Sequence, residues 1–355
     1  MKQPPVLERI RRMTGYQPGE QPREGELLKL NTNENPYPPS PKVAEAVERA
    51  TRDGLERYPQ PLADPLREAA ALRYGVSADE VLAGNGSDEL LSICMRAAVA
   101  PGDGVSYAVP TYSLYRTLAE LAGARVREIP ADPGTVPAEL AAGGSKVIFV
   151  CSPNSPFGCP VAPEDVDQLA ATTNALVVAD EAYVDFGGRT ALPLIAKHEN
   201  LVVLRTFSKS FSLAGVRLGL AFGSRGLIAE LAKVKDSYNV SRLAVAAGVA
   251  ALEDYSWMTN NCARVIATRD RTVARLRDLG LTVPPSAANF FWVDCSSIGG
   301  GRRVYEALRG EGLLVRFFDA EGLRDGVRVS VGTDDAMDRL LTVIETLCES
   351  ARTFG

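Results

Sequence analysis

The sequence predicts an α/β fold with a mostly parallel central sheet in a large domain, followed by a smaller α+β domain. Between about residues 41 and 255, short apolar segments alternate with helical patterns, which is typical of βαβ units around a parallel sheet. A long proline-free helical pattern at 257–279 then precedes a tail in which strand and helix patterns mix. The 355 residues are enough for two buried cores. We therefore expect an amino-terminal arm (1–40), a large domain (41–255) and a small domain (256–355).

The individual elements follow in chain order. The first 40 residues are rich in Pro, Gly and Asn, which predicts an extended arm. In the large domain, apolar segments predict strands at 105–107, 147–151, 176–179, 201–205 and 218–222. Residues 257–279 predict a helix that links the domains. In the small domain we expect strands at 289–293, 313–315 and 327–331, a helix around 304–308 and an amphipathic helix at 336–347.

Composition excludes several classes of function. A net charge of −5 gives no reason to expect binding to nucleic acid or membranes, and no apolar segment approaches the ~20 residues of a membrane span. The first residues lack the apolar core and cleavage site of a secretion signal. The six cysteines form no Cys-x-x-Cys pair and His198 is the single histidine, so we expect no metal site and no Ser-His-Asp chemistry. Reduced thiols in a cytoplasmic protein are the preferred interpretation.

The segment after the predicted strand at 201–205 is the most informative in the chain. Lys209 follows Thr206 and Ser208 at the end of this strand, and Arg217 lies eight residues further on. A lysine in this place can form a Schiff base with an aldehyde cofactor, while hydroxyl groups and a guanidinium can hold the cofactor's phosphate. The alternative is a loop with a solvated lysine, and three further features favour the cofactor site.

The first of these features is Asp180, which follows the apolar segment 176–179, with Tyr183 three residues on. Ligands of open α/β sheets bind outside the carboxyl ends of the strands, where a carboxylate can pair with a protonated pyridine nitrogen. Tyr183 can reach the phenolic oxygen that lies beside the aldehyde on such a cofactor. The alternative for Asp180 is a helix cap.

The other two features are turns that follow or precede predicted elements. The strand at 147–151 is followed by a turn that contains Asn154. The glycine-rich turn Gly84-Asn85-Gly86 runs through Ser87 and Asp88 into a helical pattern, so backbone N–H groups there can bind an anion.

Together these segments resemble the fold-type I pyridoxal-phosphate (PLP) aminotransferases, and most closely the histidinol-phosphate aminotransferase branch. The resemblance covers nearly the whole chain. It includes the segments Asn31–Pro38, Arg57-Tyr58-Pro59, Pro110-Thr111-Tyr112, Ala288-Asn289-Phe290 and Val327–Thr333.

The resemblance implies roles for the cofactor residues. Lys209 carries PLP and moves the proton during transamination, and Asp180 and Tyr183 contact the cofactor ring. Tyr112 is expected to stack on that ring, although a tyrosine after Pro-Thr is as often ordinary core packing. The phosphate is expected to be held by the backbone of Ser87 and Asp88 together with Thr206, Ser208 and Arg217. Tyr58 is expected to reach the phosphate of the partner subunit, which implies a homodimer with shared sites.

The resemblance also implies substrate contacts. Arg328 is expected to bind the α-carboxylate, and Arg316 the phosphate of the preferred substrate, with Tyr16 and Asn33 as walls of the pocket. A surface ion pair is the alternative for Arg328.

The chain departs from the family at one site. Ser155-Pro156-Phe157-Gly158 stands where the family has Asn-Pro-Thr-Gly, so the asparagine is displaced to Asn154. Either Asn154 substitutes for the family's asparagine, or Tyr183 acts without it.

The expected function is the conversion of imidazole acetol phosphate and glutamate into histidinol phosphate and 2-oxoglutarate. Its substrates are then a small-molecule amino donor and keto acceptor. Within the same fold, an aromatic or other amino-acid aminotransferase and a threonine-phosphate decarboxylase remain alternatives, because they share the cofactor site. A non-catalytic sensor with an aminotransferase-like body is disfavoured, since such regulators carry an added DNA-binding domain and this sequence has no basic segment.

Overall fold

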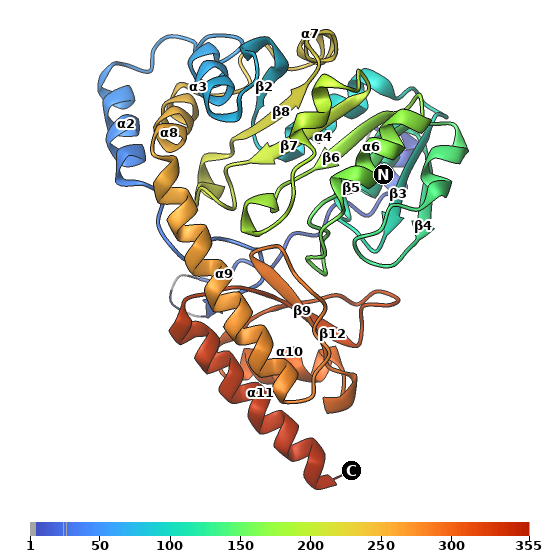
Figure 1. Ribbon diagram of the computed structural model, residues 1–355, viewed down its shortest axis with the longest axis vertical. Helices are drawn as coiled ribbons and strands as arrows, with labels where there is room; N and C mark the ends of the chain where they lie inside the picture. Colours follow the sequence, from blue (N-terminus) through green and yellow to red (C-terminus); the bar gives the residue numbers. More distant parts are fainter. Residues whose placement is uncertain (1–4, 24, 26, 355) are drawn as a thin grey trace.

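The computed structural model describes residues 5–23, 25 and 27–354 (Figure 1). Its upper part in the figure is built on a seven-stranded sheet, and the long helix α9 runs from there into a lower part that holds a smaller sheet. The boundaries of the three expected parts, at residues 40 and 255, stay a prediction.

The large sheet has the strand order β2-β8-β7-β6-β5-β3-β4. All its neighbours pair in parallel except β8, which is antiparallel to both β2 and β7. The mostly parallel sheet is therefore confirmed. Its strands are β2 (Val81–Gly84), β3 (Gly104–Val109), β4 (Arg125–Pro130), β5 (Ser145–Cys151), β6 (Leu176–Asp180), β7 (Leu201–Thr206) and β8 (Gly219–Gly223).

Helices cover both faces of this sheet. One face packs on α4 (Ser87–Ala98), α5 (Leu114–Ala122) and α7 (Arg225–Lys233), and the other on α3 (Asp64–Tyr74), α6 (Pro163–Thr172) and α8 (Arg242–Glu253). Because side chains alternate along a strand, β6 sends Leu176 and Val178 to the first face and Val177 and Ala179 to the second. The same alternation directs Asp180, the last residue of β6, toward α4 and α5.

Serine caps begin several of the helices. The Ser40 hydroxyl accepts a hydrogen bond from the Lys42 N–H at the start of α2 (Pro41–Arg52), where Pro41 fits the first helical position.

Short 3-10 turns lie at Ala78–Glu80, Ala138–Gly143, Val184–Phe186, Leu192–Ala196, Ala214–Val216 and Ser296–Ile298.

The lower part contains a three-stranded antiparallel sheet in the order β11-β12-β9. Helices α9 and α11 lie side by side against it, and the carboxyl terminus lies at its far end (Figure 1). The elements are α9 (Tyr255–Asp278), β9 (Phe290–Asp294), α10 (Gly301–Gly310), β10 (Leu313–Leu314), β11 (Arg316–Phe317), β12 (Gly326–Ser330) and α11 (Asp334–Phe354).

The amino-terminal segment is less extended than the composition predicts. It contains a short helix, α1 (Glu8–Arg12), and a two-residue strand, β1 (Leu28–Lys29), that pairs in parallel with β10. Pairing with β10 satisfies backbone groups of the arm, and Leu30 and Asn33 both bond to Ser330 in the lower part of the molecule.

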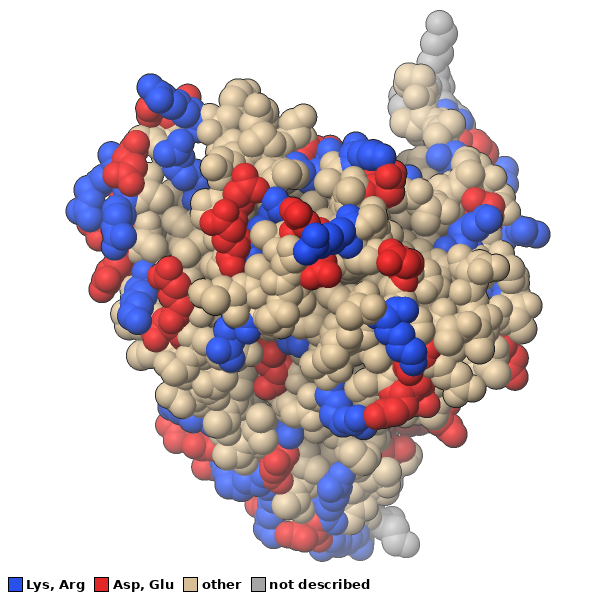
Figure 2. Space-filling model, turned by 45° about the horizontal axis from the view of Figure 1, so that its top comes forward, with Lys and Arg blue, Asp and Glu red and all other residues tan. Residues whose placement is uncertain are grey.

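The face shown in Figure 2 carries lysine and arginine side chains interspersed with aspartate and glutamate. No helix among the described residues is long and apolar enough to span a bilayer.

Candidate active site

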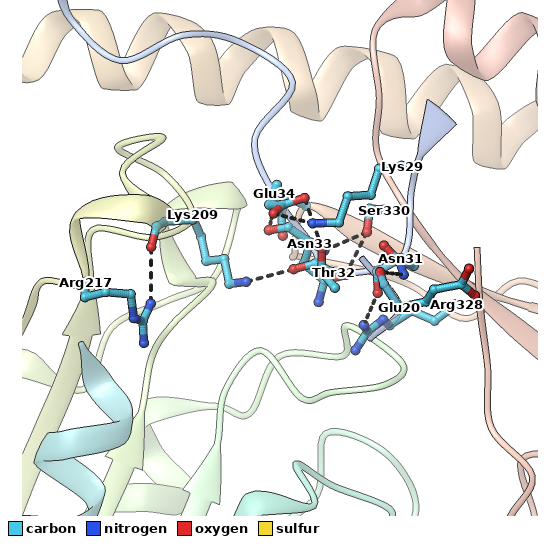
Figure 3. Close-up of polar contacts among 12 residues, drawn as sticks. Glu20, Lys29, Asn31, Thr32, Asn33, Glu34, Lys209, Arg217, Arg328 and Ser330 are labelled. Carbon is cyan, nitrogen blue, oxygen red and sulfur yellow. Dashed lines mark hydrogen bonds and ion pairs between the residues drawn. The ribbon is translucent and has the colours of Figure 1, made fainter. Parts of the chain in front are cut away.

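Lys209 lies in the turn after β7 and extends toward the amino-terminal arm (Figure 3). Its Nζ donates a hydrogen bond to the Thr32 carbonyl at 3.0 Å, and the Asn35 amide donates to the Lys209 carbonyl at 3.2 Å. Burial, with a smaller contribution from the positive charge of Arg328, lowers the pKa of Lys209 to about 8. A free lysine has a pKa of about 10.4, so this amine is far more often in the neutral, nucleophilic form.

Asp180 ends β6 and is buried, with 4% of the residue's surface exposed. One oxygen accepts a hydrogen bond from the Tyr115 hydroxyl at 2.8 Å, and the other from the Ala182 N–H at 3.3 Å. Burial raises the pKa of Asp180 to about 6. Within the described part of the chain no lysine or arginine forms an ion pair with this carboxylate, so it is suited to a cationic group on a ligand.

A group of polar atoms gathers where α4 begins, beside the turn that carries Lys209. The Arg217 guanidinium donates to the Ser208 hydroxyl at 3.2 Å and pairs with the Asp88 carboxylate at 3.3 Å. Gly86, with φ +86°, precedes Ser87, and a Cβ on this glycine would lie 2.7 Å from Arg217 Nη2. The glycine therefore permits the close approach of the guanidinium to the first turn of α4, whose N–H groups attract anions.

Thr206 lies within the same turn, but its hydroxyl contacts the backbone. It donates to the Leu218 carbonyl at 3.4 Å and accepts from the Ser208 N–H at 3.2 Å. These bonds shape the turn between β7 and Lys209. A direct contact of Thr206 with phosphate stays a prediction.

Tyr183 and Asn33 meet although 150 residues separate them. The Asn33 amide donates to the Tyr183 hydroxyl at 3.1 Å. Asn33 has φ +57°, a conformation that costs energy for a residue with a side chain. It is held there because its N–H donates to the Ser330 hydroxyl at 2.8 Å and its carbonyl accepts from the Asn289 amide at 2.9 Å. Burial raises the pKa of Tyr183, which keeps the hydroxyl protonated.

Arg316 and Arg328 are direct partners across the antiparallel pair β11 and β12. Like charges opposite each other are destabilising unless an anion lies between them. Arg328 donates to the Asn31 carbonyl at 2.8 Å and to the Ser155 hydroxyl at 3.1 Å, and its buried Nε has no partner among the described residues. Burial lowers the pKa of Arg328. This guanidinium therefore has a remaining donor for an anion.

Arg316 is bound to the arm. Its two terminal nitrogens donate to the Gln17 carbonyl at 3.1 Å and the Pro18 carbonyl at 3.2 Å. The ring of the neighbouring, exposed Tyr16 packs edge-on against Tyr112 at 5.8 Å between ring centroids. The arm thus brings Tyr16 and Arg316 to the same side of the site.

Asn154 and Ser155 differ in what they contact. The Asn154 amide donates to the Pro110 carbonyl at 3.0 Å and accepts from the Phe157 N–H at 3.4 Å, so it is bonded to backbone groups. Ser155, which stands where the family has asparagine, instead reaches Arg328. The role of Asn154 at the cofactor stays a prediction. Ser155 and Tyr115 are site residues that the sequence interpretation missed; the place of Ser155 in the motif was a usable signal.

Tyr58 lies between α2 and α3, with 78% of its surface exposed and its ring stacked on Tyr238 at 4.5 Å. Such an exposed aromatic side chain is available to a partner molecule.

The assembled residues fit PLP. Lys209 supplies an amine, Asp180 a buried carboxylate, and the cradle of Gly86, Ser208 and Arg217 suits a phosphate. An amine, a carboxylate and a phosphate cradle are the three contacts that this cofactor requires of a protein.

Comparison with known proteins agrees with this geometry. Residues 25–344 match the family described as aminotransferase class I and II. The chain is 43% identical over 344 residues to histidinol-phosphate aminotransferase 1 of Nostoc sp., covering 96% of this chain and 97% of the relative. It is 41% identical to the histidinol-phosphate aminotransferase of Rhodopirellula baltica, covering 96% and 95%. A crystal structure of histidinol-phosphate aminotransferase from Sinorhizobium meliloti with pyridoxal-5'-phosphate superimposes with a TM-score of 0.88, at 28% identity, over 98% of each chain.

Proposed function

Because the chain belongs to the aminotransferase class I and II family, we propose that it is a histidinol-phosphate aminotransferase of histidine biosynthesis. It is an enzyme, and its cofactor is PLP. The observation that carries the proposal is the placement of three groups at one edge of the sheet. Asp180 ends β6 beside the end of β7, and the charge of Arg217 acts on the amine of Lys209 in the turn that follows β7.

When bound, PLP supplies an electron sink for the substrate's α-carbon. Asp180 would hold the proton on the pyridine nitrogen, and Ser208, Arg217 and the first turn of α4 would bind the phosphate. Lys209 would hold the aldehyde carbon covalently and, once released as a neutral amine, its Nζ would accept the proton of the substrate's α-carbon and pass it to the former aldehyde carbon. Its pKa of about 8 suits a group that must give and accept a proton near neutral pH. Tyr183, oriented by Asn33, would face the phenolic oxygen.

The substrate side rests on the two facing arginines. Arg328 would bind the α-carboxylate of glutamate, and Arg316 the phosphate of histidinol phosphate, after exchanging the carbonyls of Gln17 and Pro18 for the anion. A forked guanidinium can bind either a carboxylate or a phosphate, so one pocket can serve both half-reactions. Tyr16 and Asn33 would form its walls. Tyr112 would cover the ring of the cofactor.

We infer that the enzyme acts as a homodimer in the cytoplasm. The exposed Tyr58 supports the dimer, because it would complete the phosphate site of the partner subunit. The six cysteines are unpaired and buried, which is expected of reduced thiols.

Two measurements test the proposal. Borohydride reduction of the protein with PLP, followed by peptide mapping, should place the adduct on Lys209 and not on Lys233 or Lys235. Single-turnover reactions with histidinol phosphate, histidinol, tyrosine and phenylalanine should then show the fastest transfer from histidinol phosphate. An adduct elsewhere would refute the site. Equal rates for histidinol phosphate and histidinol would favour the aromatic-aminotransferase alternative.

A further inference from the structure

Tyr115 contacts both Tyr112 and Asp180 in the cofactor site, and the proposed reaction assigns it no role. It lies in the first turn of α5 and its side chain is fully buried. Its ring stacks on Phe149 at 4.5 Å with an interplanar angle of 9°, and lies edge-on to Tyr112 at 5.7 Å. Its hydroxyl donates to Asp180 Oδ2 at 2.8 Å. The same side chain thus contacts the tyrosine expected on the cofactor ring and the carboxylate expected at its nitrogen.

The surroundings of Asp180 oppose a negative charge. The carboxylate is buried, the Cys151 thiol and the Asp88 and Glu181 carboxylates lie around it, and none of these groups is cationic. Tyr115 is therefore the one side chain that donates a hydrogen bond to this carboxylate among the described residues. A hydrogen bond to a charged acceptor is stronger than one between neutral groups, so the bond from Tyr115 substantially favours the ionised carboxylate.

We propose that Tyr115 is a positioning residue, whose hydroxyl holds the Asp180 carboxylate in the ionised form and in the orientation that pairs with the pyridine nitrogen of PLP. This inference rests on the proposed cofactor site. It assigns to Tyr115 a role that packing alone does not explain, since phenylalanine would stack on Phe149 equally well.

The hydroxyl also opposes the effect of burial on the carboxylate. Burial raises the pKa of Asp180 to about 6, and the hydrogen bond from Tyr115 acts in the opposite direction. Without it, more of the carboxyl group would be protonated near neutral pH. A neutral carboxyl group would bind a protonated pyridine less tightly.

Titration of the apoprotein with PLP, followed by tryptophan fluorescence, tests the proposal. Tyr115→Phe should raise the Kd for PLP by about tenfold, as the loss of one hydrogen bond to a charged group predicts. The decisive probe is an analogue of PLP with a C–H in place of the ring nitrogen, which has no proton to share with Asp180. Its Kd should change by less than about twofold, because the hydroxyl acts through Asp180.

Tyr107→Phe is the matched control. Tyr107 is also a buried tyrosine, 5.8 Å from Tyr115 between ring centroids, but its hydroxyl donates to Glu128. This variant should bind both ligands as the wild type does. A second comparison introduces Tyr115→Phe into Asp180→Asn, where no buried charge is left to stabilise. There the Kd for PLP should change by less than about twofold.

The outcomes separate the two hypotheses. Failure of the wild-type protein to bind PLP would refute the proposed function itself. If the wild type binds, an unchanged Kd in Tyr115→Phe would overturn the role of the hydroxyl. An equal loss for PLP and the analogue, or a further tenfold loss in the Asp180→Asn background, would show that Tyr115 acts through packing and would also overturn it.

Discussion

Replacement of Asp180 by asparagine should make the apoprotein more stable at pH 8 while weakening its affinity for PLP. No described residue gives this buried carboxylate a cationic partner, so its charge destabilises the folded state. Asparagine keeps the shape but carries no charge. The charge that is expected to bind the cofactor thus lowers the stability of the folded protein.

The magnitude follows from the pKa of Asp180, which burial raises to about 6. In the unfolded chain the value is about 3.9. The folded state binds the proton of Asp180 more tightly than the unfolded state does. The contribution of Asp180 to the free energy of unfolding is therefore most favourable below pH 3.9 and is lost as pH rises through 6. Relative to the protein with Asp180 protonated, ionisation lowers the free energy of unfolding by about 3 kcal/mol at pH 8 and by about 1.5 kcal/mol at pH 5.

The amide subtracts from this gain. Asparagine has one acceptor oxygen, whereas both oxygens of Asp180 now accept hydrogen bonds, from Tyr115 and from the Ala182 N–H. One of these bonds is lost, at about 1 kcal/mol. The net gain is then about 2 kcal/mol at pH 8, falling to zero between about pH 4 and 5.

Urea unfolding of the two apoproteins at pH 8, 7, 6 and 5, monitored by circular dichroism, measures the difference. Asp278→Asn, at the exposed end of α9, is the control and should show no comparable change between pH 5 and 8. A variant that is less stable than the wild type at pH 8, or a difference independent of pH, would refute the reasoning. Added PLP should stabilise the wild type more than Asp180→Asn.

Three further outcomes are expected. The rate at which the apoprotein reacts with PLP, followed by stopped-flow absorbance, should rise with pH with a midpoint near pH 8 and level off above about pH 9, because burial lowers the pKa of Lys209 to about 8 and the neutral amine attacks; a midpoint above pH 10 would contradict this. Mixing inactive Tyr58→Phe and Lys209→Ala proteins should restore part of the activity, and failure to do so despite subunit exchange would argue for sites built from one chain. In Arg328→Ala, the single-turnover rate with glutamate should fall by at least about a hundredfold. In Arg316→Ala, the rates with both substrates should fall, and the rate with histidinol phosphate should fall most. Equal losses in the two variants would refute the assignment of a separate anion to each arginine.

Local sequence identified the central strands because a strand buried on both faces is a nearly continuous apolar segment. The strands predicted at 147–151, 176–179 and 201–205 correspond to β5, β6 and β7. In contrast, β4, which reads Arg-Val-Arg-Glu-Ile-Pro, was missed. It is an edge strand with exposed charged residues, so its sequence lacks the apolar signal.

The sequence by itself placed Lys209 and Asp180 at strand ends, because the residues that follow a buried parallel strand must emerge at the same edge of the sheet. The tertiary structure alone decided which side chains surround them. It directs the Tyr115 hydroxyl to Asp180 and brings Asn33 to Tyr183. It also sets Arg316 opposite Arg328 through the register of β11 and β12. Such contacts join segments that are distant in the chain, and local patterns carry no information on the packing that brings them together.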